Sequence, residues 1–195
     1  MFKALIPSDA ILGVIADVLV VREYELCKEF KLLGNRGVVV DGGAHTGLWA
    51  LRASTCARKV IAIEPSFSNF QILTTNLSMN PCNVIPINAA LWHGKEALSL
   101  VESENSTMHH VEKGNGKPIW AITLEELGRQ HGEIDLLKLD VEGAEENILL
   151  QSTIDAIRNI RHIVGEMHVW NWEIPSIARI VDRLTEAGYN VRVLK

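Results

Sequence analysis

The segment from Val38 to Gly47 constrains the fold more than any other part of the chain. It reads V-V-V-D-G-G-A-H-T-G, a β-branched apolar run followed by Asp41 and a glycine-rich turn. Such a run is typical of a parallel strand that is buried on both faces. Gly42, Gly43 and Gly47 let the backbone turn sharply and approach a ligand closely. Because open α/β sheets bind ligands at the carboxyl ends of their strands, we expect a doubly wound α/β fold with a ligand at this turn.

The spacing of the glycines indicates which nucleoside the turn accepts. A dinucleotide-binding turn reads G-x-G-x-x-G and places a pyrophosphate at a helix N-terminus. Here the residues from Gly42 read G-G-A-H-T-G, so the middle glycine is displaced by one, and Asp41 would repel a pyrophosphate. A cationic nucleoside without phosphate, such as S-adenosylmethionine, fits an acidic turn better, with Ala44 and His45 beside it. A nicotinamide-dependent dehydrogenase and a turn that merely joins strand to helix are the alternatives.

The rest of the chain alternates between strand and helix patterns, as a doubly wound, mostly parallel sheet requires. Further strands are expected over residues 59–64, 83–88, 134–140, 162–168 and 189–194, and helices over 8–30, 48–57, 67–79, after Thr123, over 145–157 and over 175–187. Residues 93–120 break this rhythm and predict a hairpin insertion over the ligand cleft. Tyr24 and Glu25, in the first helix, could touch a ligand, although packing and solvent-exposed roles are the more ordinary alternatives.

The strands over residues 59–64 and 83–88 supply the next candidates for cofactor binding. The first ends at Glu64, about twenty residues beyond the glycine turn, where a carboxylate can bind both ribose hydroxyls, and Pro65 then ends the strand. The second contains Pro86, which removes a ladder donor and predicts an edge strand. Asn88 and Ala89 at its end are expected to border the adenine. A surface acid at a strand end is the alternative for Glu64, and a turn asparagine for Asn88.

The last two parallel strands end in the residues that we assign to the chemistry. Lys138 and Asp140 share a strand face by alternation, and a buried lysine needs a partner such as that carboxylate. Glu142 follows in an acid-rich turn, and the next strand ends with Glu166 and His168 on one face. Asp140 and Glu142 are the stronger candidates, and a structural role is an equal alternative for His168.

Size and composition predict a single globular domain. The chain has 195 residues, of which 47% are hydrophobic and 22% charged, and its net charge of −5 argues against DNA as a partner. We expect one domain over residues 1–195, divided into an N-terminal helical segment (1–36) and a Rossmann-like core (37–195). Three widely spaced cysteines are typical of reduced thiols, and the apolar run over residues 10–21 is too short to span a membrane, so a cytoplasmic location is expected. The oligomeric state cannot be predicted.

Three motifs together resemble the FkbM-type methyltransferases. They are D-G-G-A-H-T-G from Asp41, the pair Glu64-Pro65, and L-K-L-D-V-E-G-A-E from Leu137, which is the most specific of the three. The glycine turn alone would indicate only a class I methyltransferase. The resemblance extends from about residue 24 to residue 168. It implies an enzyme of the class I, Rossmann-like fold that depends on S-adenosylmethionine.

The resemblance also implies roles for the candidate residues. Asp41, Gly43 and Gly47 would form the cofactor turn, Glu64 would hold the ribose, and the region of Asn88 and Ala89 would border the adenine. Asp140 and Glu142 would lie at the reactive end, facing Glu166 and His168. The chain ends soon after its sixth predicted strand, whereas the full fold has a seventh, antiparallel strand, so that strand is expected to be missing. Specificity would then depend on residues 93–120 and the first helix.

These roles predict O-methyl transfer to a hydroxyl of a small molecule or glycan. His168, Asp140 or Glu142 would act as the base and Lys138 as an electrostatic organiser. No resident metal is expected, although the same carboxylates with His168 could alternatively hold a divalent cation. The turn after Asp140 lacks the Asn/Asp-Pro-Pro-aromatic run of enzymes that methylate amino groups of nucleic acids. An RNA methyltransferase and a non-catalytic S-adenosylmethionine-binding module remain as alternatives.

Overall fold

The computed structural model describes residues 3–10, 36–103, 106–114, 118–168 and 174–192. The helix expected over residues 8–30 lies outside these ranges, together with Tyr24 and Glu25, except for a turn at residues 8–10. The fold below is that of the described residues.

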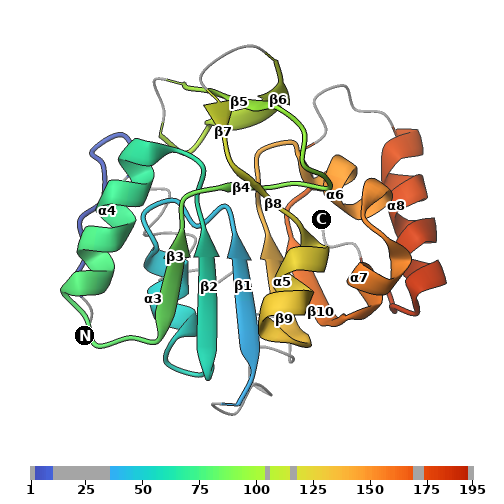
Figure 1. Ribbon diagram of the computed structural model, residues 1–195, viewed down its shortest axis with the longest axis horizontal. Coiled ribbons are helices and arrows are strands. Elements are labelled where there is room, and N and C mark those ends of the chain that lie inside the picture. Colours follow the sequence, from blue (N-terminus) through green and yellow to red (C-terminus); the bar gives the residue numbers. More distant parts are fainter. Residues whose placement is uncertain (1–2, 11–35, 104–105, 115–117, 169–173, 193–195) are drawn as a thin grey trace.

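Five parallel strands form the central sheet in the order β10-β9-β1-β2-β3 (Figure 1). They are β1 (Val38–Gly42), β2 (Lys59–Ile63), β3 (Val84–Ile87), β9 (Ile134–Leu139) and β10 (Ile160–Gly165). The chain moves outward from β1 to β3 and then returns to the other side of β1, so β1 and β9 flank the point at which the strand order reverses. Ligands of open α/β sheets bind at such points. The edge position predicted for β3 from Pro86 is confirmed.

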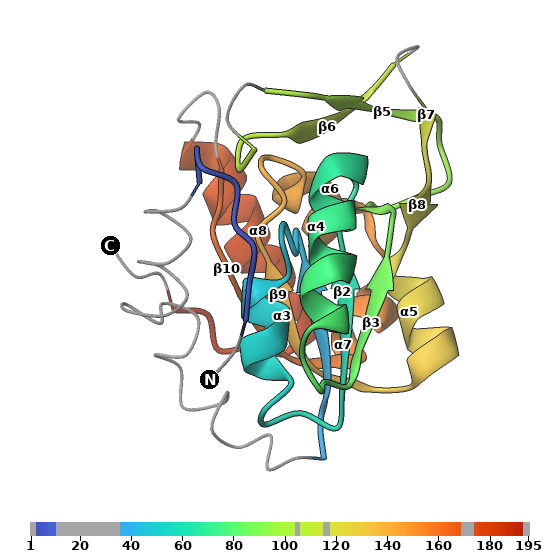
Figure 2. The same ribbon diagram turned by 90° about the vertical axis from the view of Figure 1, so that its left-hand side faces the viewer.

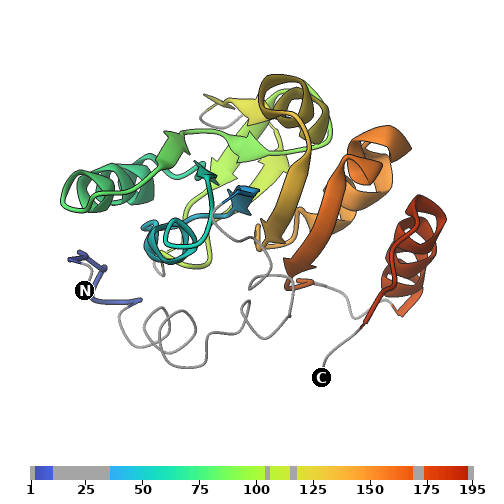
Figure 3. The same cartoon turned by 90° about the horizontal axis from the view of Figure 1, so that it is seen from below.

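The two faces of the sheet fill separate cores. Val38 and Val40 face the core that contains residues of α5, α6, α7 and α8, whereas Val39 faces the core that contains residues of α3 and α4. Ile61 and Ile63 follow the same alternation in β2. Helices α3 and α5 lie on opposite sides of the sheet (Figure 2), and the view from below shows the same layers (Figure 3). The doubly wound, mostly parallel sheet is therefore confirmed, as is a first strand buried on both faces.

Helices α3 and α4 end earlier than the sequence patterns predict, whereas α8 begins one residue earlier and ends where predicted. The bounds of the helices are Leu48–Ala53 (α3), Phe67–Ser78 (α4), Leu124–His131 (α5), Glu145–Gln151 (α6), Ile154–Arg158 (α7) and Ile174–Ala187 (α8). The single helix expected over residues 145–157 is wrong. Ser152 is extended, with ψ of 153°, and the Thr153 side chain accepts a hydrogen bond from the backbone of Ala156, so α7 begins anew after a cap.

The insertion over residues 93–120 lies across the carboxyl edge of the sheet (Figures 1 and 2). Strands β5 (Leu98–Val101) and β6 (His110–Lys113) pair as an antiparallel hairpin, and β7 (Pro118–Ile119) pairs with the other edge of β5. Two short strands, β4 (Ala90–Leu91) and β8 (Ala121–Ile122), pair in parallel where the chain enters and leaves. Sequence patterns gave no sign of this last pair, because two residues are too few to show an alternation.

The final strand expected over residues 189–194 is absent from its described part, because residues 189–192 adopt no regular structure. The single O–H of Tyr189 is instead shared between the carbonyls of Ile157, at 2.8 Å, and Ile160. These bonds hold the chain beside α7 and the start of β10. Within the described residues, no helix is both long and apolar enough to cross a membrane.

Candidate cofactor and active site

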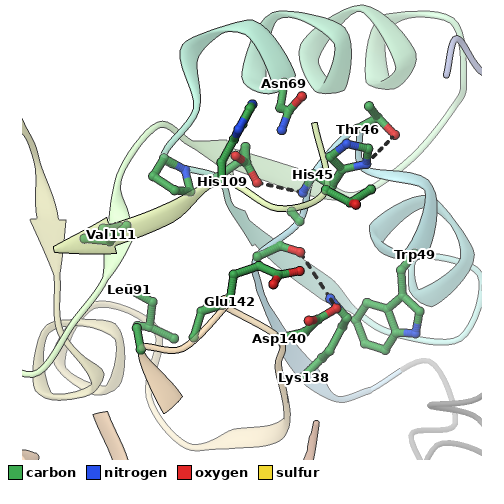
Figure 4. A pocket seen from close by; sticks show the side chains of 18 of the residues that line it. His45, Thr46, Trp49, Asn69, Leu91, His109, Val111, Lys138, Asp140 and Glu142 are labelled. Atoms are coloured by element: carbon green, nitrogen blue, oxygen red, sulfur yellow. Dashed lines mark hydrogen bonds and ion pairs between the residues drawn. The ribbon is translucent and has the colours of Figure 1, made fainter. Parts of the chain in front are cut away.

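A cavity of about 260 Å³ lies at the carboxyl ends of β1, β2 and β9 (Figure 4). The insertion forms its opposite wall through Ser106, Thr107, His109 and Val111. Residues of all three motifs line it, among them Gly43, Ala44, His45, Glu64, Pro65, Lys138, Asp140 and Glu142, and Glu166 lines it from the end of β10. The other predicted site residues lie outside the lining: Asp41, Gly42, Gly47, Asn88, Ala89 and His168.

Asp41 and Lys138 form a buried ion pair beneath the glycine turn. They lie opposite one another in β1 and β9, and Nζ of Lys138 is 3.3 Å from Oδ1 of Asp41 and 3.2 Å from Oδ2 of Asp140. Burial disfavours the charge on Lys138, but the two carboxylates outweigh it and raise the lysine pKa. Burial also raises the pKa of Asp41 to about 6, against the opposing effect of Lys138. Lys138 is therefore charged and joins the ends of two strands.

Gly43 allows the turn to pack directly against the end of β9. Its φ is 77°, and a Cβ atom at this position would lie 1.7 Å from the carbonyl oxygen of Asp140. Lys138 adds a hydrogen bond from Nζ to the Gly43 carbonyl at 3.1 Å. This glycine is thus required by contact between two backbone segments, a reason that the sequence pattern did not reveal.

Glu64 lies at the end of β2 with both carboxylate oxygens facing backbone donors. Oε2 accepts a hydrogen bond from the His45 N–H at 2.8 Å, and Oε1 accepts one from the Ser66 N–H at 2.9 Å. Burial raises the pKa of Glu64 to about 7, although these two hydrogen bonds oppose the rise. The side chain is thus fixed in the cavity wall in contact with the glycine turn.

Asn88 supports this wall from behind. Its side-chain amide donates to the backbone carbonyls of Glu64, at 2.8 Å, and Pro65, at 3.2 Å. Ala89 is buried, and the next two residues, Ala90 and Leu91, line the cavity instead. Contact of Asn88 and Ala89 with an adenine remains a prediction.

His45 connects the glycine turn to the insertion. Its Nε2 lies 3.2 Å from the Ser106 hydroxyl, and Asn69 donates to the Ser106 carbonyl at 3.0 Å. Asp9 accepts a hydrogen bond from the Ser106 N–H at 2.7 Å. Burial and the charge of Lys138 lower the pKa of His45 to about 4, so its ring is neutral at pH 7. These contacts hold the insertion over the cavity.

Acidic side chains surround His168 beyond the ends of β9 and β10. Nδ1 of His168 lies 3.0 Å from Glu145, and Nε2 lies 3.6 Å from Glu142 and 3.7 Å from Glu166. The hydrogen bond to Glu145 raises the pKa of His168 to about 9, against the effect of burial. Burial raises the pKa of Glu142 to about 7, and His168 opposes that rise.

Glu145 organises the loop between β9 and α6. It is 1% exposed and accepts hydrogen bonds from the N–H groups of Val141, at 2.9 Å, and Gly143, at 3.0 Å. The same loop holds Glu142 at φ 51°, a left-handed conformation that is uncommon outside glycine and often found at functional sites. Glu145 ends the motif that begins at Leu137, but the sequence indicated no role for it in the site.

Several residues that line the cavity lie outside the motifs and could not be predicted from them, among them Trp49, Asn69, Leu91, Ser106, Thr107, His109 and Val111. The indole ring of Trp49 lies 5.9 Å from Nζ of Lys138. Ser66, which caps α4, could have indicated that the first turn of that helix, and so Asn69, lies near Glu64. The insertion residues carry no motif, because their approach depends on the path of the loop.

The fold and site define a doubly wound α/β protein with a cavity at the switch point between β1 and β9, where proteins of this class bind their ligands. The Methyltransferase FkbM domain matches residues 41–191, and the chain belongs to this family. The resemblance in the three motifs is thereby confirmed. The family implies S-adenosylmethionine as the cofactor.

One curated relative is the hexuronic acid methyltransferase AglP of Haloferax volcanii. The two are 32% identical over 137 residues, which cover 67% of this chain and 56% of AglP. The chain therefore matches just over half the length of this relative.

Solved structures of methyltransferases resemble the fold at low sequence identity. The precorrin-6y C5,15-methyltransferase of Geobacter metallireducens has a TM-score of 0.50 and 17% identity, over 85% of this chain and 71% of that one. An rRNA methylase of Streptococcus thermophilus has a TM-score of 0.46 and 13% identity, over 79% and 74%. The first of these likenesses agrees with the class I methyltransferase fold, and neither bears on the substrate.

Proposed function

We propose that this chain transfers a methyl group from S-adenosylmethionine to a hydroxyl oxygen of a glycan or related small molecule. One observation carries the proposal: the glycine turn, Glu64 and the acidic ends of β9 and β10 all face one cavity. A cofactor held by the first two would have its sulfonium end near the third. Family membership supports the choice of cofactor.

The residues around the cavity fit this cofactor, which supplies an electrophilic methyl group when bound. Each oxygen of Glu64 accepts one backbone N–H, the Asn69 side chain also hydrogen-bonds to the carboxylate, and a lone pair remains for a ribose hydroxyl. Asp140, Glu142 and Glu166 give the other end of the cavity a negative character suited to a cation. Asp41 would act on the turn indirectly, because it pairs with Lys138, and Lys138 donates a hydrogen bond to the Gly43 carbonyl.

Glu142 is the residue that we propose as the base. It lines the cavity (Figure 4), whereas Asp140 is paired with Lys138, and His168 lies outside the lining. The acceptor hydroxyl would give its proton to Glu142 while its oxygen bonds to the methyl carbon. The electron pair of the broken carbon–sulfur bond stays on sulfur. The cavity walls contribute by aligning the two reactants.

A sugar is the acceptor class that we favour, and two observations support it. The relative AglP is named a hexuronic acid methyltransferase. In this chain, Ser106, Thr107 and His109 add hydrogen-bonding groups to the cavity wall opposite the sheet, as a polyhydroxylated ligand requires. The cytoplasmic location predicted from the cysteine pattern belongs to the same proposal.

The test is transfer of a radiolabelled methyl group to uronic-acid oligosaccharides, neutral oligosaccharides and transfer RNA. We expect label on a sugar, and label that survives mild alkali, because an ether is stable where a methyl ester is hydrolysed. Glu142→Gln should lower the rate at least about a hundredfold, as loss of a general base does. Glu112→Gln, an exposed residue of β6 outside the cavity, is the matched control and should leave the rate unchanged.

Other results would overturn the proposal. Label on RNA alone would indicate an RNA methyltransferase. Tight cofactor binding without label on any acceptor would indicate a binding module. Unchanged rates of methyl transfer in both Glu142→Gln and Asp140→Asn would show that neither carboxylate takes part in the reaction.

A further inference from the structure

Three potential metal ligands meet where β9 and β10 end. One ligand atom each from Asp140, Glu166 and His168 lies within 4.8 Å of the others, a grouping found within the described part of the chain. Asp140 and Glu166 line the cavity. The sequence alternative placed a metal on Asp140, Glu142 and His168, whereas the structure groups Glu166, and not Glu142, with the other two.

The orientation of the His168 ring is fixed by a residue outside this group. Glu145 already accepts two backbone N–H groups, so its contact of 3.0 Å with Nδ1 of His168 is that of an acceptor facing an N–H donor. With Nδ1 donating to Glu145, Nε2 is the nitrogen from which a metal ion would displace a proton on binding, and it lies 3.7 Å from Glu166. Histidines that bind metals commonly donate their other N–H to a carboxylate in this way.

The backbone fixes the spacing between the two carboxylate ligands. Gly165 lies opposite Leu139 in the parallel register, and a Cβ atom on Gly165 would be 2.0 Å from the Leu139 carbonyl oxygen. The Glu166 N–H donates to that same carbonyl at 3.1 Å. Asp140 and Glu166, each one residue beyond this contact, are therefore held side by side.

We propose that Asp140, Glu166 and His168 bind a divalent cation that accepts both carboxylate and imidazole ligands, such as Mn²⁺ or Zn²⁺. Bonds of about 2.0–2.2 Å place neighbouring ligands of such an ion about 3.0–3.6 Å apart, so the three side chains would have to move closer together by about 1 Å to complete the site. Facing the cavity, the cation binds an oxygen of the acceptor and makes its hydroxyl more acidic. This last role rests on the proposed function; the binding of the cation does not.

The experiment is a titration of the full chain with Mn²⁺ alone, followed by electron paramagnetic resonance of the free ion. We expect one site that Glu166→Gln and His168→Gln each weaken at least tenfold. Glu145→Gln should weaken it about 10–100-fold, as loss of a carboxylate behind a metal-binding histidine does. The matched controls are Glu186→Gln and His131→Gln, which change the same residue types in α8 and α5, and they should bind Mn²⁺ like the unmodified chain. Circular dichroism verifies folding, and Glu166, with a side chain 45% exposed, can be replaced without opening the core.

Mn²⁺ affinity that is the same in Glu166→Gln, His168→Gln and the two controls would overturn the proposal, as would the absence of binding at millimolar Mn²⁺. A site-dependent Mn²⁺ signal whose removal by chelator leaves methyl transfer unchanged would overturn the role in binding the acceptor. Failure of the proposed function looks different, because no acceptor would then be methylated while the Mn²⁺ titration still shows the site.

Discussion

The space beside Gly43 is filled by the carbonyl oxygen of Asp140, so Gly43 is the glycine of the turn that tolerates substitution least. Gly43→Ala would add left-handed strain at φ 77° to a contact of 1.7 Å with backbone. We expect the free energy of unfolding to fall by about 3 kcal/mol or more, with loss of cofactor binding, because relief of the clash must separate the ends of β1 and β9. Urea unfolding measures the first effect and calorimetric titration the second.

Gly132 provides the matched control for Gly43. Its φ is also positive, at 82°, with a ψ of −150°, and no atom lies within 4 Å of the position that a Cβ would take. Gly132→Ala therefore carries backbone strain without a steric clash, and strain in this region, which is almost restricted to glycine, costs about 1–3 kcal/mol. Equal losses of unfolding free energy in the two variants would mean that the backbone at Asp140 moves aside at little cost. The close packing at Gly43 would then not be what requires a glycine.

Glu64 should make cofactor binding depend on pH. Burial raises its pKa from 4.5 to about 7, so between these values the unfolded chain ionises first and folding stability declines as the pH rises. Cofactor affinity should move in the opposite direction, because ribose hydroxyls donate best to the ionised carboxylate. From pH 6 to pH 8 we expect affinity to rise about tenfold, the change in the ionised fraction for a pKa near 7. Calorimetric titration at both pH values measures it.

Glu64→Gln separates this effect from other titrating groups. Asp41 and His45 lie nearby, with pKa values of about 6 and about 4, and they remain in the variant. The variant should bind more weakly at pH 8 and show a much flatter pH profile. A tenfold rise that persists in Glu64→Gln would assign the dependence to a different group.

At the scale of elements, the ion pair between Asp41 and Lys138 joins β1 to β9. Removing one partner of a buried pair leaves the other uncompensated, so Lys138→Met should cost about 3–5 kcal/mol. Adding Asp41→Asn to Lys138→Met should recover at least about 1 kcal/mol, because the stranded carboxylate is then gone. Urea unfolding of the four members of this cycle measures the coupling.

Lys95→Met is the comparison for Lys138→Met. Lys95 lies closer to its partner, 2.7 Å from Glu126, but its side chain is 61% exposed. Exposed pairs contribute less than about 1 kcal/mol. Lys95→Met should therefore destabilise the protein less than Lys138→Met, although the Lys95 pair has the shorter distance. Similar losses for the two methionine variants would show that burial does not decide the strength of these pairs.

Most elements of the sheet could be predicted from the sequence, and the errors have identifiable causes. Local properties of the residues predict these strands. The valines of β1 and the apolar run of β2 indicate burial, and Pro86 in β3 lacks a backbone donor. The break between α6 and α7 depends on an extended Ser152 and a cap from Thr153, within an otherwise continuous helical pattern. The irregular path after Gly188 depends on Tyr189 binding distant carbonyls, which no local pattern encodes.

The candidate site divides in the same way. Residues in motifs at strand ends, such as Glu64 and Asp140, could be assigned to the cavity because parallel strands end at one edge. Ser106 and Asn69 could not, since the insertion approaches the cavity through contacts between residues far apart in the sequence. Glu145 was missed for a further reason, because a helix-terminal acid usually faces solvent and only the structure places it behind His168.

At the scale of the whole molecule, a ligand in the cavity would touch nearly every layer of the fold. The walls come from the ends of β1, β2 and β9, from α3 and α4, and from the insertion. The unfolded chain has no such site, so S-adenosylmethionine should stabilise the native state by about 2.7 kcal/mol at one hundred times its dissociation constant. For a chain of this size we expect a Tm increase of roughly 5–10 °C, in a single transition that rises with the logarithm of the cofactor concentration. Scanning calorimetry measures it, with NAD⁺ as the matched ligand control. An equal shift with NAD⁺ would restore the dinucleotide alternative. A second transition whose temperature does not change with cofactor concentration would mean that part of the molecule unfolds independently of the site.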